Sequence, residues 1–181
     1  MQIDQAIDLI KNETGIQPVK QIWSDLGCGS GVFTKALANL LASGSIIYAI
    51  DKNKSALERI PQKIKDVLIE KLHGDFFKGE IPFNLDGIIM ANSFHFVRNK
   101  SSFIKKIEKH LKETGEILII EYDMDTPNPW VPFPISYQSL QQFFKKEMYS
   151  SIIKLKEHPS VFQRSRIYSA LIKKTNSLNI L

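Results

Sequence analysis

The chain has 181 residues, which fits one domain over residues 1–181 and leaves little for a second. Hydrophobic residues make up 43% of it and charged residues 24%, as in ordinary globular proteins, and no apolar run reaches the roughly 20 residues that a membrane-spanning helix needs. Because Cys28 is the only cysteine and the first residues lack a secretory signal pattern, we expect a cytoplasmic protein that does not enter a membrane.

The net charge of +5 is unevenly distributed along the chain. Residues 1–90 hold 10 basic and 11 acidic residues, whereas residues 91–181 hold 14 basic and 8 acidic ones. A basic half can indicate a surface for nucleic acid or for an acidic substrate. The basic residues are dispersed, with no run longer than two, and this favours a solvated lysine-rich surface instead.

Hydrophobic spacing predicts alternating strands and helices. Apolar residues at helical spacing predict a first helix over residues 3–12 that ends near Gly15. Of the later helices, one is expected to be capped by Gly44 and another to stop at Thr114 and Gly115. The predicted strands, which are continuous apolar runs for the most part, cover residues 21–26, 45–50, 67–72, 85–91, 116–122, 151–157 and 167–174, and the later helices cover residues 34–42, 54–60, 103–111 and 136–148.

Four of the eight prolines fall within residues 126–135, which predicts an ordered loop rather than a helix or a strand. The alternation before this loop implies a mostly parallel sheet with helices on both faces. The last two strands are joined by a short turn and indicate an antiparallel hairpin at one edge. The expected fold is therefore α/β, with a seven-stranded, mostly parallel sheet that ends in this hairpin.

The stretch DLGCGSG over residues 25–31 holds three of the nine glycines at the predicted junction of the first strand and the second helix. Glycines this dense indicate bare backbone that a ligand approaches, because each one costs conformational entropy on folding. A dinucleotide fingerprint requires G-x-G-x-x-G, and its third glycine would fall on Val32 or Thr34. The spacing is G-x-G-x-G, which counts against a dinucleotide.

This stretch resembles the first motif of class I S-adenosylmethionine-dependent methyltransferases, which reads acidic, hydrophobic, G-x-G-x-G. The resemblance extends over about residues 20–122 and is closest to the small-molecule type, similar to methyltransferase domains 11 and 25. It implies a three-layer, Rossmann-like fold and S-adenosylmethionine as the cofactor, with S-adenosylhomocysteine as its product. Glu113-Thr114-Gly115 stands where Pro-Gly-Gly is common in the family, and the resemblance weakens after Tyr122.

The resemblance also implies roles for residues that follow the next strands. Asp51, 20 residues past Gly31, would accept hydrogen bonds from both ribose hydroxyls, although it could also cap the helix that follows. Asp75 would take the adenine amino group, with Phe76 beside the ring, or it could be a simple turn residue. Asn92 would lie near the methionine part. The full set of expected cofactor-binding residues is Asp25, Gly27, Cys28, Gly29, Gly31, Asp51, Lys52, Asp75, Phe76 and Asn92.

Methyl transfer from a sulfonium mainly requires alignment of acceptor and methyl group, so a catalytic side chain is optional. His95 is the candidate base, and its alternative is a histidine packed between phenylalanines and hydrogen-bonded to backbone. Cys28 is expected to be a small packing residue rather than a nucleophile. No metal is expected. The acceptor would be bound by His95, Tyr122, Trp130 and Phe133, under a loop over residues 123–136, unless these aromatic residues only seal the edge of the sheet.

Methyl transfer to a small organic acceptor at an O, N or C atom is the function that the sequence favours. Nucleic-acid methyltransferases that act on exocyclic amines carry Asp/Asn/Ser-Pro-Pro-aromatic after the fourth strand, where this chain has Asn92-Ser93-Phe94-His95. Asn128-Pro129-Trp130 looks similar but follows another strand. A non-catalytic, cofactor-binding partner subunit is the remaining alternative, because only one short helix precedes the first strand.

Overall fold

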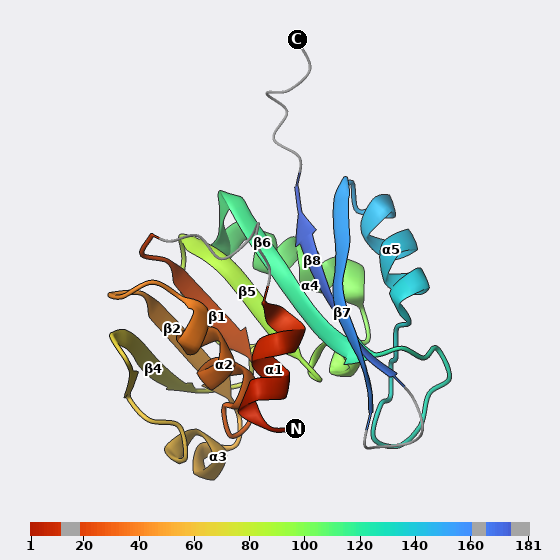
Figure 1. Cartoon of the computed structure of the whole chain (residues 1–181). Coiled ribbons are helices and arrows are strands. Elements are labelled where there is room, and N and C mark those ends of the chain that lie inside the picture. Colours follow the sequence, from red (N-terminus) through yellow and green to blue (C-terminus); the bar gives the residue numbers. More distant parts are fainter. Residues whose placement is uncertain (12–18, 161–165, 175–181) are drawn as a thin grey trace.

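The computed structural model describes residues 1–11, 19–160 and 166–174. An eight-stranded sheet in the order β3-β4-β2-β1-β5-β6-β8-β7 forms its centre (Figure 1). The strands are β1 (Ile22–Leu26), β2 (Ile46–Asp51), β3 (Lys63–Ile64), β4 (Val67–His73), β5 (Leu85–Ala91), β6 (Leu111–Tyr122), β7 (Ser151–Pro159) and β8 (Arg166–Lys173). The α-helices are α1 (Ile3–Ile10), α2 (Val32–Leu40), α3 (Lys54–Glu58), α4 (Lys100–Ile107) and α5 (Tyr137–Lys146), and two 3₁₀ turns cover Phe94–Phe96 and Glu108–His110.

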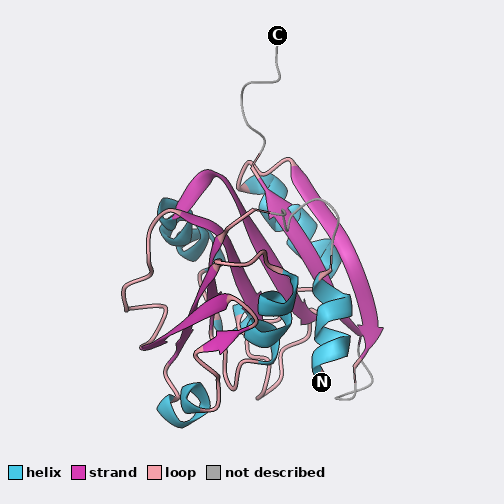
Figure 2. Ribbon diagram, turned by 60° about the vertical axis from the view of Figure 1, so that its left-hand side comes forward, coloured by secondary structure: helices cyan, strands magenta, loops and turns pink. Residues whose placement is uncertain are grey.

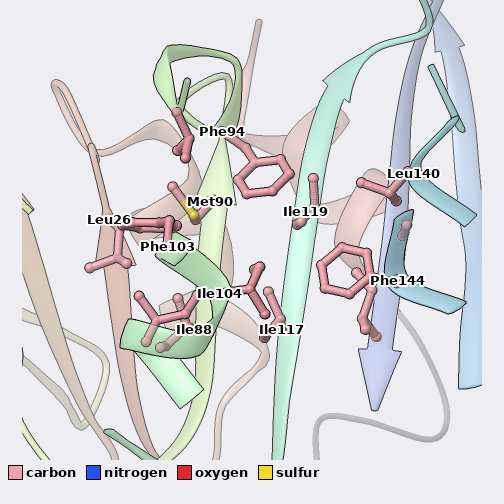
Figure 3. Packing of buried hydrophobic residues seen from close by; sticks show 14 of the residues in the cluster. Leu26, Ile88, Met90, Phe94, Phe103, Ile104, Ile117, Ile119, Leu140 and Phe144 are labelled. Carbon is pink, nitrogen blue, oxygen red and sulfur yellow. The ribbon is translucent and has the colours of Figure 1, made fainter. Parts of the chain in front are cut away.

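Helices cover both faces of the sheet, which gives three layers (Figures 1 and 2). One buried cluster joins the sheet to α4 and α5 through side chains such as Phe103, Ile104, Leu140 and Phe144 (Figure 3). A second cluster on the opposite face joins α1, α2 and α3 to the sheet around Trp23. Burial on both faces explains why the central strands are continuously apolar in sequence.

The parallel part of the sheet consists of β4, β2, β1, β5 and β6. Chain order runs outward from β1 in both directions, so the strand order reverses between β1 and β5. Carboxyl ends of parallel strands meet at one edge, and ligands in such sheets bind where the order reverses. The predicted hairpin is confirmed, since β8 pairs antiparallel with both β6 and β7.

The sheet has one strand more than the predicted seven. The additional β3 has two residues, Lys63 and Ile64, and pairs antiparallel with the outer side of β4. Two residues are too few to produce a periodic pattern, so hydrophobic spacing gives no signal for this strand.

Several predicted boundaries were wrong. The second helix ends at Leu40, and Gly44 lies three residues beyond its cap, in the turn before β2 with a φ of +81°. α4 begins at Lys100 because the Asn99 side chain caps it, accepting a hydrogen bond from the Ser102 N–H. β6 begins at Leu111 and runs through the expected turn at residues 114–115.

Pairing with β5 explains the early start of β6. Leu111 lies opposite Leu85, and the register then shifts so that Glu116 lies opposite Gly87. The first helix ends at Ile10, and its predicted end near Gly15 lies outside the described residues. The expected serine cap of α5 is confirmed, since the Ser136 hydroxyl accepts a hydrogen bond from the Ser139 N–H.

Candidate functional site

Three cavities meet at the carboxyl edge of the parallel strands, and all three are lined in part by Asn92. The β2–β4 cavity, of about 190 Å³, lies past the ends of β2, β4 and β5. The glycine-loop cavity, of about 250 Å³, lies against residues 27–33. The α1–β7 cavity, of about 350 Å³, lies between the start of α1 and the end of β7. Asn92 therefore stands where three neighbouring spaces adjoin.

The glycine loop presents bare backbone to these spaces. Gly27, Gly29 and Gly31 all have φ between +54° and +77°, a region that side chains disfavour. A Cβ on Gly27 would lie 2.7 Å from the Cβ of Ser93, so the end of β5 closes that side of the loop. A Cβ on Gly29 would meet nothing within 4 Å. The middle glycine therefore faces open space of the kind that a closely approaching ligand needs.

Asp51 holds the glycine loop to the end of β2. Its Oδ2 accepts a hydrogen bond from the Gly29 N–H at 2.7 Å, and its Oδ1 accepts one from the Asn53 N–H at 2.8 Å. A carboxylate offers about four acceptor positions, so Asp51 can still accept two hydroxyl groups. The alternative that Asp51 caps α3 is wrong, because the Asn53 side chain does so. Asp51, the residue expected to bind the ribose, thus lines the β2–β4 cavity.

The end of β4 supplies the opposite wall of the β2–β4 cavity. Asp75 accepts a hydrogen bond from the Phe77 N–H through Oδ1 at 2.8 Å, as a turn residue would. This bond leaves Oδ2 of Asp75 for the expected contact with adenine. Phe76 is buried in the core and also lines the cavity, as does Lys52, which is exposed. Ser93, Phe77 and the half-exposed Phe96 line this cavity as well, although no sequence motif predicts a role for them there.

Two buried oxygens in the glycine-loop cavity lack hydrogen-bond partners. The Oδ2 of Asp25 accepts from the Thr34 hydroxyl at 2.6 Å, while its Oδ1 is unpaired. Asn92 has a φ of +51°, and its side-chain Oδ1 is also unpaired. Burial raises the pKa of Asp25 to about 7, opposed by the Thr34 hydrogen bond and increased further by the charge of Asp51. Unpaired buried acceptors are costly and suit a ligand that donates hydrogen bonds.

Cys28 lies between the glycines with its sulfur 3.8 Å from the Gly29 carbonyl oxygen. Burial raises the pKa of its thiol, and the charges of Asp25 and Asp51 raise it further. A thiolate is therefore disfavoured, which agrees with a packing residue and argues against a nucleophile.

His95 is buried, with only 3% of its surface exposed, and lines none of the three cavities. Its Nδ1 lies 2.7 Å from Oε2 of Glu121, and its backbone N–H donates to Oε1 of the same carboxylate at 3.0 Å. The packed-histidine alternative is therefore closer to the structure, with a carboxylate in place of the expected backbone partner. Glu121 was missed from sequence, although a carboxylate that directly follows the buried apolar residues 117–120 signals a buried partner.

The proline-rich loop is attached beside this pair through the backbone of Phe133. Its N–H donates to the His95 carbonyl at 3.0 Å, and its carbonyl accepts from Nζ of Lys100 at 2.7 Å. Burial lowers the pKa of Lys100 to about 8, opposed by the charge of Glu121. The His95–Glu121 pair therefore holds in place the His95 carbonyl group to which the loop is attached.

The expected acceptor residues do not line one cavity, although Tyr122 and Phe133 both lie next to His95. Tyr122 lines the α1–β7 cavity. Trp130 is 76% exposed and Phe133 is 36% exposed, and neither lines any of the three cavities. The α1–β7 cavity is lined instead by residues that the sequence analysis did not select: Met1, Gln5, His158, Pro159, Ser160 and Ile167.

Within the described part of the chain, no cluster of three or more His, Cys, Asp or Glu side chains could hold a metal ion. Among the same residues, no helix is both long and apolar enough to span a membrane.

Residues 24–117 match the family model of a methyltransferase domain. The chain is 30% identical over 95 residues to the cypemycin N-terminal methyltransferase of Streptomyces sp, covering 50% of this chain and 38% of that protein. It is 26% identical over 102 residues to the malonyl-[acyl-carrier protein] O-methyltransferase of Priestia megaterium, covering 56% and 37%. The aligned segment thus spans less than two-fifths of either curated relative.

The fold is similar to that of Burkholderia thailandensis 1,6-didemethyltoxoflavin-N1-methyltransferase, solved with S-adenosylhomocysteine. The TM-score is 0.71 at 14% identity, over 96% of this chain and 78% of that one. With the family match over half of its length, the chain belongs to the methyltransferase domain family.

The buried carboxyl group of Asp25 predicts pH-dependent ligand binding. The α-ammonium group of S-adenosylhomocysteine favours an ionised Asp25, whose pKa is about 7. We therefore expect affinity to fall several-fold between pH 8 and pH 6, measured by calorimetry. Asp25→Asn should weaken binding at pH 8 and flatten this dependence, and an unchanged profile in that variant would remove Asp25 from the site.

The same raised pKa has a consequence for stability without ligand. The folded protein binds the Asp25 proton more tightly than the unfolded chain does. The stabilisation from this group is therefore complete below its ordinary pKa of 3.8 and is lost as the pH rises toward 7.

Removal of Glu121 should destabilise the fold. Glu121→Ala deletes both hydrogen bonds to His95 and leaves a buried ring without its partner, so we expect a loss of about 2 kcal/mol or more in free energy of unfolding by urea titration. The control is Lys112→Ala, which removes the partly exposed pair with Asp86 and should cost less than about 1 kcal/mol. Equal losses in the two variants would contradict the role given to the buried pair.

Proposed function

We propose that the chain transfers the methyl group of S-adenosylmethionine to a small, mostly apolar organic acceptor held in the α1–β7 cavity. The observation that supports this proposal most directly is that the three cavities share lining residues. Asn92 lines all three, and Met1 lines both the glycine-loop and the α1–β7 cavities. A cofactor in the first two spaces would therefore end beside an acceptor in the third.

In this proposal each part of the cofactor is bound by a different polar group of the chain. Asp51 binds the ribose hydroxyls, and Asp75 with Phe76 binds the adenine. The unpaired oxygens of Asp25 and Asn92 accept hydrogen bonds from the methionine end. The open space above Gly29 gives room for close approach. The two orphaned acceptors and the bare glycine support this fit.

When bound, S-adenosylmethionine supplies a methyl group that its sulfonium charge already makes electrophilic. The protein's work is then to hold the acceptor in line with that methyl group and to exclude water. Side chains of Met1, Tyr122, Pro159 and Ile167 give the acceptor cavity an apolar lining suited to this. His95 acts as a positioning residue that supports the loop, because it reaches none of the cavities.

The acceptor atom can be O, N or C. One curated relative is named for N-terminal methylation of cypemycin and the other for O-methylation of malonyl-[acyl-carrier protein], so relatives of this domain differ in acceptor. The acceptor cavity of this chain is formed in part outside the matched segment, where such differences would arise, by Met1, Gln5, His158, Pro159, Ser160 and Ile167.

Ligand-dependent stabilisation tests the cofactor assignment. At 100 times its dissociation constant, S-adenosylhomocysteine should stabilise the folded state by about 2.7 kcal/mol. This raises the melting temperature by roughly 5–10 °C for a chain of this size. NAD at the same concentration should leave the melting temperature unchanged. Stabilisation by NAD alone would contradict the proposal.

The variant Asp51→Ala assigns the effect to the ribose site. It removes the carboxylate that the ribose hydroxyls require and should weaken S-adenosylhomocysteine about 10-fold or more by calorimetry. The matched variant Asp66→Ala, which removes an exposed carboxylate paired only with Lys63 among ion pairs, should bind the ligand with unchanged affinity.

A further inference from the structure

At the edge of the α1–β7 cavity lies a histidine–carboxylate pair that the cofactor site does not use. His158, near the end of β7, lines the cavity, and its Nε2 lies 2.8 Å from Oδ2 of Asp8 on α1. Lys156 places its Nζ 3.4 Å from the other oxygen of Asp8. The side chains of His158 and Asp8 are 36% and 47% exposed, so solvent reaches the pair, of which His158 lines the cavity.

The hydrogen bond to Asp8 determines which ring nitrogen can accept a proton. Hydrogen bonds from His158 and Lys156 hold the pKa of Asp8 below its ordinary value, so Asp8 is an ionised acceptor. Nε2 of a neutral His158 must then carry the hydrogen and donate it, which leaves the lone pair on Nδ1. The hydrogen bonds found among the described residues do not occupy Nδ1.

Two further ionisable side chains, Glu157 and Tyr122, lie near the pair. Glu157 lies on the opposite face of β7, because neighbouring strand residues alternate, and it pairs there with Arg166 of β8. Tyr122 lines the same cavity from β6, and burial together with the charge of Glu121 raises the pKa of its hydroxyl. Tyr122 therefore remains neutral, and among the described residues the charged side chains paired in this cluster with His158 are Asp8 and Lys156.

The lining of the cavity restricts the acceptor. Besides His158, the polar side chains of its described lining are Gln5, Asn92, Tyr122 and Ser160, all of them neutral, and no Lys, Arg, Asp or Glu side chain among the described residues lines it. A carboxylate or phosphate acceptor would lose its water without gaining a lysine or arginine side chain from these residues. A neutral hydroxyl or amine would avoid that cost but must give up a proton when it is methylated.

We propose that His158 is the general base for this acceptor, that Asp8 positions it, and that the acceptor is a neutral, mostly apolar molecule with a protic hydroxyl or amine group. The proposal rests on the proposed methyltransferase function and identifies its acceptor class. As the bond from the acceptor atom to the methyl carbon forms, the carbon–sulfur bond breaks and its electron pair stays on sulfur. The acceptor's proton passes to Nδ1 of His158, and the resulting imidazolium is stabilised by Asp8 and releases the proton to solvent.

The first test measures the pair without any ligand. In protein labelled with ¹⁵N-histidine, the nitrogen shifts of neutral His158 should report hydrogen on Nε2 and a lone pair on Nδ1. Asp8→Asn should reduce the fraction of this tautomer, because a neutral amide holds the Nε2 hydrogen less strongly than a carboxylate does. The opposite tautomer in the parent protein, or an unchanged tautomer ratio in Asp8→Asn, would overturn the pair.

The second test follows labelled methyl transfer to two panels of acceptors. One panel holds neutral phenols, catechols and arylamines, and the other holds carboxylic acids of similar size. We expect methylation within the neutral panel. His158→Gln should lower kcat by about 100-fold or more and remove the acidic limb of the pH profile, since general bases contribute at least that much. Glutamine can still donate to Asp8, so the contact that supports the fold is kept.

Controls separate this proposal from the proposed function. S-adenosylhomocysteine affinity and melting temperature should be unchanged in His158→Gln, and Asp8→Asn should fall between it and the parent in kcat. His110→Gln, at a histidine stacked on Phe83 away from the cavities, should behave as the parent does. Methylation of carboxylic acids only, or of neither panel, or an unchanged kcat in His158→Gln, would overturn the inference while cofactor binding stands. Failure to bind S-adenosylhomocysteine would instead overturn the proposed function on which it rests.

Discussion

The parallel pairing of β1 with β2 on one side and β5 on the other is the constraint on which the site depends. In this register Leu26 lies level with Ile50, and Asp25 lies level with Ile89 of β5. Each strand therefore ends at the same edge, and the residue after each end enters the same space. The glycine loop, Asp51 and Asn92 converge because their strands are held in this register.

The buried polar groups of this edge divide into two kinds. His95 and Glu121 satisfy each other and attach the proline-rich loop, so they belong to the scaffold. Asp25 and Asn92 each keep one buried oxygen unpaired, and Asp25 has a raised pKa as a result of its burial. Such groups cost stability in the free protein, and a cofactor that donates hydrogen bonds would offset this cost.

The alternation of strands and helices and the position of the glycine loop could be predicted from the sequence because both are local, and the cofactor-binding roles remain predictions. Glycines between a buried strand and a helix need no distant partner to be recognised, and single carboxylates after the next strands follow from chain order. The extra strand β3 was missed because two residues have no period. The early start of β6 was missed because it follows from pairing with Leu85, a contact across 26 positions of the sequence.

The acceptor side could not be predicted in the same way. Its cavity joins the start of α1 to the end of β7, which are about 150 positions apart and meet only because α1 packs against the hairpin. Trp130 and Phe133 were predicted to bind the acceptor because they are aromatic residues in a stiff loop. Their position relative to the cavities depends on how that loop is attached at Phe133. His158 follows a predicted strand directly, and nothing near it in the sequence indicates that it lies beside Asp8.

The crystal structure of the protein with S-adenosylhomocysteine is the most direct test of the central claim that the three cavities form one continuous site. The account predicts adenine beside Asp75 and Phe76, ribose hydroxyls within hydrogen-bond distance of Asp51, and the homocysteine sulfur next to Asn92, facing the α1–β7 cavity. Density for the ligand outside the β2–β4 and glycine-loop cavities, or with its sulfur turned away from the α1–β7 cavity, would contradict it.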